Sequence, residues 1–274
     1  MWRRYEKGGI FMKIAVVIPF HNAGQWLGRC LDSISDEFEV FLVNDHSTDN
    51  SERVIVDKCS ERLHKNWHLT NVMTRRTGVS HARNSGLTEA ICVGAHYVTF
   101  LDADDEFAPD AYSQMLGAIA EAPEDKLIQM NHVFITPEGS LRQRFPNRRG
   151  TYTPAKLPKL WASSCNKLFR TDLVKNKYFN EDLRHGEDEL FVLECLAQSR
   201  RLYNSERVAL RYHKDNPNSL STITSAEDLI GEQMALIDFL DRHRDDSEIC
   251  EAVRIRQTEL WTNPVYKKNF GGTK

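Results

Sequence analysis

The chain has 274 residues, of which 41% are hydrophobic and 27% are charged. That share of apolar residues is enough for a sizeable core and excludes an intrinsically disordered chain. The formal net charge is −3, so no overall positive field attracts nucleic acid or an anionic membrane. The length allows one domain with an addition, or two small domains of the usual size.

The sequence also argues against a membrane-spanning protein, a secreted disulfide scaffold and a zinc finger. The longest apolar run, Ile14–Phe20, is far shorter than the roughly 18 residues of a membrane helix. The segment before this run lacks the apolar stretch that a signal peptide contains. The six cysteines are widely spaced, without CxxC or zinc-ligand spacing. We expect a reduced, cytoplasmic protein without a transmembrane segment, and peripheral association with the inner face of the membrane stays open.

Strands and helices alternate along the first half of the chain. Nearly continuous β-branched runs predict buried strands, and apolar residues at helical spacing predict the helices between them. Asn22 is a candidate N-cap for the first helix. This order is typical of βαβ units in a parallel, doubly wound sheet. The predicted strands are Lys13–Phe20, Glu39–Asn44, Trp67–Met73 and Tyr97–Leu101; the predicted helices are Ala23–Ser35, Ser51–Lys65, Val79–Val93 and one that begins at Pro109.

Beyond about residue 125 the pattern is less regular. We predict strands over Leu127–Ile135, Ser140–Phe145 and Ser163–Arg170, and helices over Glu187–Gln198, Leu229–Leu240 and Ile249–Leu260. This organisation suggests one half at 12–106, a second half at 107–221 and a helical appendage at 222–274. Residues 1–11 carry charges and a Gly-Gly break, so we expect a dispensable leader, with Met12 as the natural start. The alternative is that Trp2 and Tyr5 pack on the domain.

Three carboxylates follow the predicted strand Tyr97–Leu101, in the sequence Asp102-Ala103-Asp104-Asp105. Ligands of open α/β sheets bind beyond the carboxyl ends of the strands. Carboxylates this close repel one another unless a cation lies between them, and hard oxygen ligands select Mg²⁺ or Mn²⁺. Taken alone, the pattern is more often a solvated turn with an N-cap aspartate, because short motifs recur by chance.

Two more polar segments stand out, the first of them at the same edge of the predicted sheet and the second at the start of a helix. Residues 44–49, Asn-Asp-His-Ser-Thr-Asp, follow the second strand. An aspartate there can accept a hydrogen bond from a base or ribose, although an ordinary Asx turn has the same composition. Residues 78–84, Gly-Val-Ser-His-Ala-Arg-Asn, open a helix. Arg83 there offers forked donors to a nucleobase or phosphate, or is a surface arginine.

Together and in this order, these segments resemble the family 2 glycosyltransferases of the GT-A fold. The resemblance covers about residues 13–195 and continues more weakly to about 222. It implies an α/β, Rossmann-like fold with a mostly parallel central sheet flanked by helices and a small C-terminal helical appendage. It is carried by VVIPFHNAGQWLGRCLDSI (16–34), VNDHSTDNS (43–51), GVSHARNSGL (78–87), VTFLDADDEF (98–107), NKLFR (166–170) and GEDELF (186–191).

The resemblance also implies a donor site for a nucleotide sugar, with UDP favoured, in the half at 12–106. Pro19 and its neighbours would line the nucleobase pocket, and Asp45 would bind the base. Arg83 would approach the base or the diphosphate. Asp105 would lie on the side of the donor sugar, and Asp102 would meet the ribose as well as the metal.

The same resemblance implies a divalent cation, Mn²⁺ or Mg²⁺, and a catalytic base. Asp102 and Asp104 would hold the cation, and His213 is a candidate late ligand; a surface histidine at a strand end is the alternative. In the acidic pair Glu187 and Asp188 we favour Asp188 as the general base, acting with inversion of the donor sugar. A helix that begins at this pair would keep both carboxylates ionised.

The chain departs from the family's pattern at two positions. Asn44 stands where the family commonly has the first of two aspartates, and Thr77 stands where an asparagine is usual. The neighbours Arg75 and Arg76 could compensate by contacting phosphate. Neither departure touches the aspartates 102 and 104 or the acidic pair, so we expect activity, with a less certain nucleotide preference.

Other functions stay open. A nucleotidyltransferase that makes sugar nucleotides uses a similar fold, but Pro19–Gly28 has two glycines and no lysine for a triphosphate. A non-enzymatic nucleotide-binding module is a third possibility. We expect a glycan or glycolipid of the bacterial surface as acceptor. The basic loop Arg142–Arg149 also suggests a modified nucleic-acid base, which the acidic net charge disfavours.

Overall fold

The computed structural model describes residues 12–61, 66–72, 77–136, 138–139, 141–144, 148–157, 162–217 and 225–262. The leader predicted at residues 1–11 and Arg76 lie outside the described residues. Within these ranges the strands form one ten-stranded sheet in the order β3-β2-β1-β4-β9-β6-β10-β5, with β7 beside β6 and β8 beside β10. This is the α/β architecture that the sequence predicts.

The elements follow the predicted order closely. The strands are β1 Ile14–Phe20, β2 Glu39–Asn44, β3 Trp67–Asn71, β4 Tyr97–Phe100, β5 Glu106–Phe107, β6 Leu127–Ile135, β7 Leu141–Arg144, β8 Gly150–Tyr152, β9 Lys167–Arg170 and β10 Leu202–His213. The helices are α1 Gly24–Asp32, α2 Ser51–Glu61, α3 Val79–Cys92, α4 Ala111–Glu121, α5 Thr171–Val174, α6 Glu187–Ser199, α7 Ala226–Arg242 and α8 Ser247–Thr262, with a short 3₁₀ turn, η1, at Pro154–Lys156.

Counted by paired residues, the described sheet is mostly parallel, as predicted, and β7 adds an antiparallel pair with β6. β1 pairs in parallel with β2 and β4, β2 with β3, and β6 with β10. Antiparallel pairs join β9 to β4 and β6, and join β5 and β8 to β10. Because β9 runs antiparallel to both of its neighbours, β6 and β10 point the same way as β1. Their carboxyl ends therefore reach the same edge of the sheet as those of β1, β2 and β4.

β10 was not predicted from the sequence, although its carboxyl end lies at that edge of the sheet beside the end of β6. Its middle is polar, with Asn204, Ser205, Glu206 and Arg207 in succession, so it lacks the alternation of a half-buried strand. Its register to β6 shifts between Asn204 and Val208 and again before Leu210. A strand interrupted in this way gives no periodic signal in the sequence.

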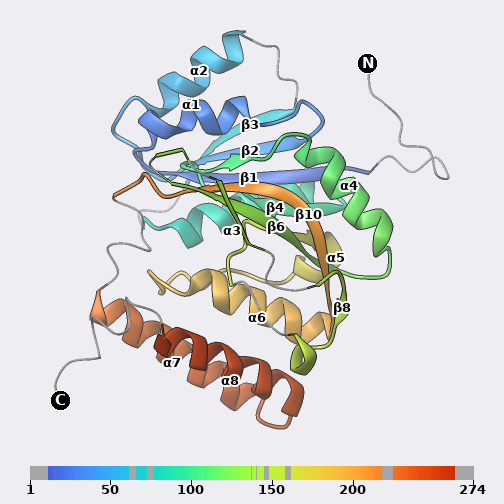
Figure 1. Ribbon diagram of the computed structural model, residues 1–274. Helices are drawn as coiled ribbons and strands as arrows, with labels where there is room; N and C mark the ends of the chain where they lie inside the picture. The colour runs from blue at the N-terminus through green and yellow to red at the C-terminus, as the bar shows by residue number, and fades with distance from the viewer. Residues whose placement is uncertain are drawn as a thin grey trace.

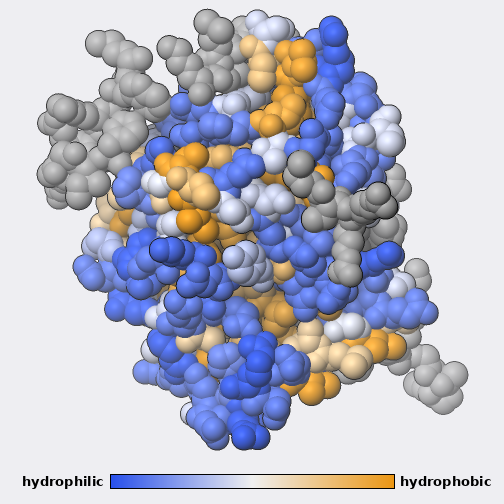
Figure 2. Space-filling model, turned by 180° about the vertical axis from the view of Figure 1, so that it is seen from behind, coloured by the Kyte–Doolittle hydropathy of each residue, from blue (hydrophilic) through white to orange (hydrophobic). Residues whose placement is uncertain are grey.

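The helices lie in separate groups around the sheet (Figure 1). α1 and α2 lie side by side at one end of the molecule, whereas α6 lies between the sheet and the hairpin of α7 and α8 at the other. On the face shown in Figure 2, hydrophobic surface is divided into patches among hydrophilic surface. Among the described residues, the length and apolarity needed to cross a bilayer are found in none of the helices.

Asn22 does not cap α1, in contrast to the prediction. It has a positive φ of 48°, and its side-chain oxygen accepts hydrogen bonds from the backbone N–H groups of Thr48 and Asp49. The first helical N–H, that of Gly24, donates instead to Asp49 Oδ2 at 2.9 Å. The acceptor for this N–H is therefore Asp49, from the loop after β2, and not Asn22. This hydrogen bond connects the loop after β1 to the loop after β2.

α3 packs closely on β1 and β2 because Gly86 has no side chain. A Cβ atom at this position would lie 2.4 Å from Val17 Cγ1 and 3.0 Å from Val43 Cγ2. Both valines are fully buried. This close approach sets the height of α3 above the strand ends, and α3 carries Arg83 in its first half.

We predict that Gly86→Ala destabilises the protein by about 1–3 kcal/mol, since overpacking a filled core has a cost of that size. The melting temperature should fall by several degrees. Gly28→Ala in α1 is the matched control: its new Cβ would have its nearest neighbour at 4.0 Å, so the helix propensity of alanine should leave stability unchanged or slightly higher. Equal melting temperatures for the two variants would contradict the packing argument.

Candidate functional site

A cavity of about 410 Å³ opens at the carboxyl ends of β1, β2 and β4. Its lining brings together side chains that are far apart in the sequence. Most of the residues that the sequence analysis assigned to the donor site lie here, and Asn216, which it did not single out, joins them. The predicted residues in the lining are Pro19, Asp45, Arg83, Asp102 and Asp104.

Asp45 joins three segments at one wall of this cavity. Its side chain is buried, and its Oδ2 accepts a hydrogen bond from the backbone N–H of Gly78 at 2.7 Å. Its own backbone N–H donates to the carbonyl of Phe20 at 2.8 Å. His21 Nδ1 lies 2.5 Å from the carbonyl oxygen of Asp45. These contacts hold the loops after β1 and β2 and the start of α3 in one arrangement around the cavity.

Arg83 is a buried connector and not a surface arginine. Only 3% of it is exposed. Its Nη2 donates to Asp102 Oδ1 at 2.9 Å. Its Nη1 donates to Glu187 Oε1 at 2.8 Å and lies 3.1 Å from Asp188 Oδ1. Its guanidinium also lies over the ring of Phe179, 5.4 Å from the centroid. One cation thus joins the carboxylates of the two predicted halves of the site.

The charge balance around Arg83 follows from its burial. Burial opposes the charged form, but Asp188, Asp102 and Glu187 outweigh it and raise the pKa of Arg83 well above its ordinary value. A buried charge whose partner is removed costs about 3–5 kcal/mol, whereas the intact group is held in place by its contacts. The guanidinium is therefore a permanent cation of the site.

Glu187 and Asp188 differ in their surroundings, although they are neighbours at the start of α6. Glu187 is buried, and burial together with the charge of Asp188 raises its pKa to about 7 against the opposing effect of Arg83. The expectation that the helix dipole keeps both carboxylates ionised therefore fails for Glu187 below about pH 7. The side chain of Asp188 is 21% exposed, and its Oδ1 accepts a hydrogen bond from the hydroxyl of Ser164 at 2.7 Å.

The aspartates after β4 form a tight turn in which the backbone N–H of Asp105 donates to the carbonyl of Asp102. Burial and then the nearby charge of Asp102 raise the pKa of Asp104. Its Oδ2 accepts a hydrogen bond from Asn216 Nδ2 at 2.7 Å. A divalent cation would relieve the repulsion between Asp102 and Asp104, and their oxygens are the donors that Mg²⁺ and Mn²⁺ prefer. These residues fit such a cation.

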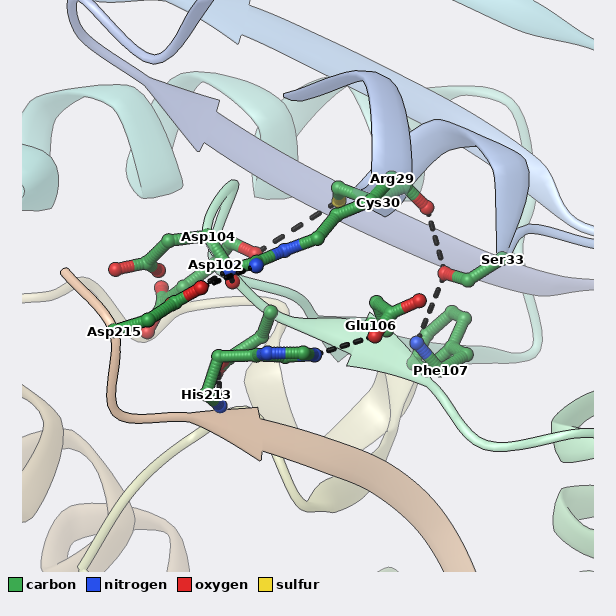
Figure 3. A network of polar contacts seen from close by, with 10 residues as sticks. Arg29, Cys30, Ser33, Asp102, Asp104, Glu106, Phe107, His213 and Asp215 are labelled. Carbon is green, nitrogen blue, oxygen red and sulfur yellow. Dashed lines mark hydrogen bonds and ion pairs between the residues drawn. The ribbon is translucent and has the colours of Figure 1, made fainter. Parts of the chain in front are cut away.

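Asp105 and His213, which were predicted at the donor sugar and at the cation, hold the end of β10 and are not among the residues that line the cavity. Asp105 is buried, and its Oδ1 accepts a hydrogen bond from the backbone N–H of His213 at 2.8 Å. Burial, followed by the charges of its two neighbouring aspartates, raises the pKa of Asp105 well above its ordinary value. The ring of His213 is hydrogen-bonded through Nε2 to Glu106 (Figure 3).

Over the described part of the chain, His, Cys, Asp and Glu side chains do not gather in groups of three or more suited to a metal ion. This does not conflict with a cation on Asp102 and Asp104, because Mg²⁺ is commonly held by one or two carboxylates together with substrate phosphates. The phosphates would then complete the coordination shell. Nε2 of His213 is hydrogen-bonded to Glu106 in this arrangement, and its role as a late ligand stays a prediction.

Arg29 and Asp215 are residues of the site that sequence reasoning missed. Arg29, on α1, donates to both carboxylate oxygens of Asp215 at 2.6 and 2.9 Å and to the carbonyl of Asp104 at 2.7 Å (Figure 3). The pair is 186 positions apart in the chain, so no local pattern could reveal it. It fastens the segment after β10 to the turn that holds the predicted metal ligands.

Comparison with known proteins gives the context for this geometry. The family model described as "Glycosyl transferase family 2" matches residues 15–176. The teichoic acid poly(glycerol phosphate) polymerase of Staphylococcus epidermidis is 34% identical over 199 residues, which are 67% of this chain and 26% of that protein. The poly(ribitol-phosphate) beta-N-acetylglucosaminyltransferase TarS of Staphylococcus aureus is 27% identical over 251 residues, 85% of this chain and 42% of that protein.

A solved structure, that of S. aureus TarS 1-349 in complex with UDP-GlcNAc, has the same fold. Its TM-score is 0.76 at 23% sequence identity, and the match covers 92% of this chain and 74% of that one. At this identity the likeness concerns the fold alone. The chain spans 26% and 42% of the length of the two curated relatives named above.

The raised pKa of Glu187 gives a pH dependence of stability. A carboxyl group whose pKa is higher in the folded than in the unfolded protein lowers the free energy of unfolding as it ionises. The free energy of unfolding therefore falls between about pH 4.3 and about pH 7 because of Glu187. The size of this fall is roughly 1.4 kcal/mol for each unit of pKa difference. We predict that Glu187→Gln removes this fall. Melting temperatures of the variant should therefore decrease less between pH 5 and pH 8 than those of the wild type.

The control for this measurement is Glu227→Gln, which changes an exposed carboxylate on α7 and should keep the wild-type pH dependence. If Glu187→Gln and the wild type lose stability in parallel over this range, Glu187 does not titrate there.

Proposed function

We propose that this chain, which belongs to glycosyl transferase family 2, transfers a sugar from a UDP-sugar to a hydroxyl of a phosphate-containing cell-wall polymer. The observation that carries the proposal is Arg83, because it joins an aspartate of the donor cavity to the acidic pair at the start of α6. Sugar transfer requires the donor and the proton acceptor to be held in a fixed geometry. The Arg83 guanidinium contacts carboxylates on both sides and can hold them in that way.

The donor half of the proposal covers residues 12–106. Asp45 would bind the base at the cavity wall where Pro19 lies, and Asp102 and Asp104 would hold Mn²⁺ or Mg²⁺ against the diphosphate. When bound, the cation stabilises the charge of the departing UDP as a Lewis acid. The contact of Asp104 with Asn216 keeps its carboxylate turned toward the end of β10.

The acceptor half covers residues 107–221, and Asp188 is the proposed base. It is more exposed than Glu187, and the hydroxyl of Ser164 orients one of its oxygens. Asp188 would take the proton from the acceptor hydroxyl as that oxygen attacks the anomeric carbon and UDP leaves. With a base and without an enzyme nucleophile, the configuration of the sugar is inverted.

The proposed acceptor class comes from the relatives. One polymerises glycerol phosphate for teichoic acid, one adds N-acetylglucosamine to poly(ribitol phosphate), and GgaB of Bacillus subtilis, 25% identical over 246 residues, takes part in minor teichoic acid biosynthesis. We therefore place the acceptor among such polymers and the reaction in the cytoplasm. The six free cysteines are consistent with a reducing compartment.

The donor and its cation are tested with a panel of UDP-, GDP-, dTDP- and CDP-sugars, scored by thermal shift with and without Mn²⁺ or Mg²⁺. We predict a metal-dependent shift with UDP-sugars that Asp104→Asn abolishes together with transfer, while the fold survives. Asp241→Asn, at an exposed site on α7, is the matched control and should keep both. Undiminished turnover in Asp104→Asn would disprove the metal assignment.

The base is tested with Asp188→Asn. We predict a fall in kcat of at least about 100-fold, since general base catalysis contributes about 10²–10⁴-fold. UDP affinity should stay within about twofold, because the base acts on the acceptor. Glu187→Gln is the comparison, and a larger loss of kcat in that variant would show that Glu187 is the base.

A further inference from the structure

The turn 185–189, which carries the proposed base, is built against the C-terminal helices. Gly186 has a φ of 80°, a left-handed conformation that favours glycine, and it precedes the first residue of α6. A Cβ atom at Gly186 would lie 2.4 Å from Cγ of Glu232 on α7. The side chain of Glu232 thus packs directly on the backbone of the turn and leaves no room for a side chain at residue 186.

A polar contact with α7 fixes the residue before Gly186. His185 Nδ1 lies 3.0 Å from Glu232 Oε2, and Glu232 is 2% exposed. Burial of His185 opposes its charged form, but the hydrogen bond and charge of Glu232 outweigh it and raise the pKa of His185. A carboxylate this deeply buried is stable only with such a partner, so the contact determines where the turn lies on α7.

A charged contact with α8 fixes the residue after Asp188. Glu189 is 2% exposed; its Oε2 accepts a hydrogen bond from Nε of Arg256 at 3.0 Å and lies 3.0 Å from Nη2 of the same guanidinium. A hydrogen bond between ionised groups is stronger than one between neutral groups. The turn is therefore held on both sides of the acidic pair, once by α7 and once by α8.

We infer that the hairpin of α7 and α8 positions the Asp188 carboxylate for catalysis through two contacts, that of His185 with Glu232 and that of Glu189 with Arg256. The inference rests on the proposed function, in which Asp188 is the base. α6 lies between this hairpin and the sheet (Figure 1), so a shift of the hairpin moves the turn relative to Arg83 and Ser164. Both helices lie beyond residue 176, where the match to the family model ends. They are positioning elements of this chain and not a passive appendage.

The first test compares Glu232→Gln with Glu227→Gln, the same change at an exposed position of α7. We expect kcat of Glu232→Gln to fall about 10-fold, a part of the 10²–10⁴-fold that a general base supplies. UDP affinity and the KM for the UDP-sugar should stay within about twofold, and Glu227→Gln should match the wild type. Wild-type kcat in a cooperatively folded Glu232→Gln protein would overturn the inference.

The second test asks whether Glu232 acts through Asp188. If it does, the double variant Asp188→Asn, Glu232→Gln is as slow as Asp188→Asn alone, because residues that act as a unit are not additive. A further 10-fold loss in the double variant would show that Glu232 acts elsewhere. This comparison also separates the two proposals: wild-type kcat in Asp188→Asn rejects the base, whereas a slow Asp188→Asn with a normal Glu232→Gln rejects only the positioning role.

The α8 contact supplies an independent arm that does not depend on the folding of Glu232→Gln. Arg256→Lys keeps the charge opposite Glu189 and should retain kcat within about threefold, while Arg256→Gln should lose about 10-fold at unchanged UDP affinity. Equal kcat for the two Arg256 variants would contradict a role of this pair in positioning.

Discussion

A single buried guanidinium determines the arrangement of the site. Arg83 has three carboxylate neighbours, of which Asp102 follows β4 and the other two begin α6. A cation out of contact with water needs such partners, and carboxylates crowded together need such a cation. The charge of Arg83 is therefore tolerated only because these carboxylates are present. The donor cavity and the acidic pair cannot move independently, since displacing one leaves a buried charge without its counterion.

The fold places this cation through packing and not through local sequence. α3 lies close to β1 and β2 because Gly86 leaves room for Val17 and Val43, and this places Arg83 beside the strand ends. The guanidinium lies over the ring of Phe179, which stacks on Phe191 of α6 at 4.0 Å between centroids. The same ring thus helps to bury Arg83 and packs against α6. The residues that pack the core around α3 and α6 therefore also determine where the charge of Arg83 lies.

Residues from the second half of the chain hold the turns that carry the site residues. Arg29 on α1 holds Asp215 after β10, and Asn216 then reaches Asp104. On the opposite side of the sheet, α7 and α8 hold the turn before and after the acidic pair. In each case a charged pair joins elements far apart in the sequence. The site is a network whose parts orient one another, which suits a reaction that needs donor and acceptor in fixed register.

The sequence by itself determined the order and type of most elements. Buried strands such as Ile14–Phe20 are apolar on both faces, and helices such as Val79–Cys92 lie between strands at the expected spacing. It also indicated that Asp45 and Asp102 would meet at one edge, because the carboxyl ends of parallel strands do so, and the family resemblance added Arg83 to them. These inferences rest on local composition and periodicity, which a single sequence records.

Only the tertiary structure decided how these groups are used. It turned Asn22 away from capping α1, paired His213 with Glu106, and made Glu187 the buried member of the acidic pair. It also formed β10 from a polar stretch that no periodicity reveals. Burial, ion pairing and a shifted strand register depend on residues up to 186 positions apart. Their energies arise only when the chain is folded, so no window of the sequence contains them.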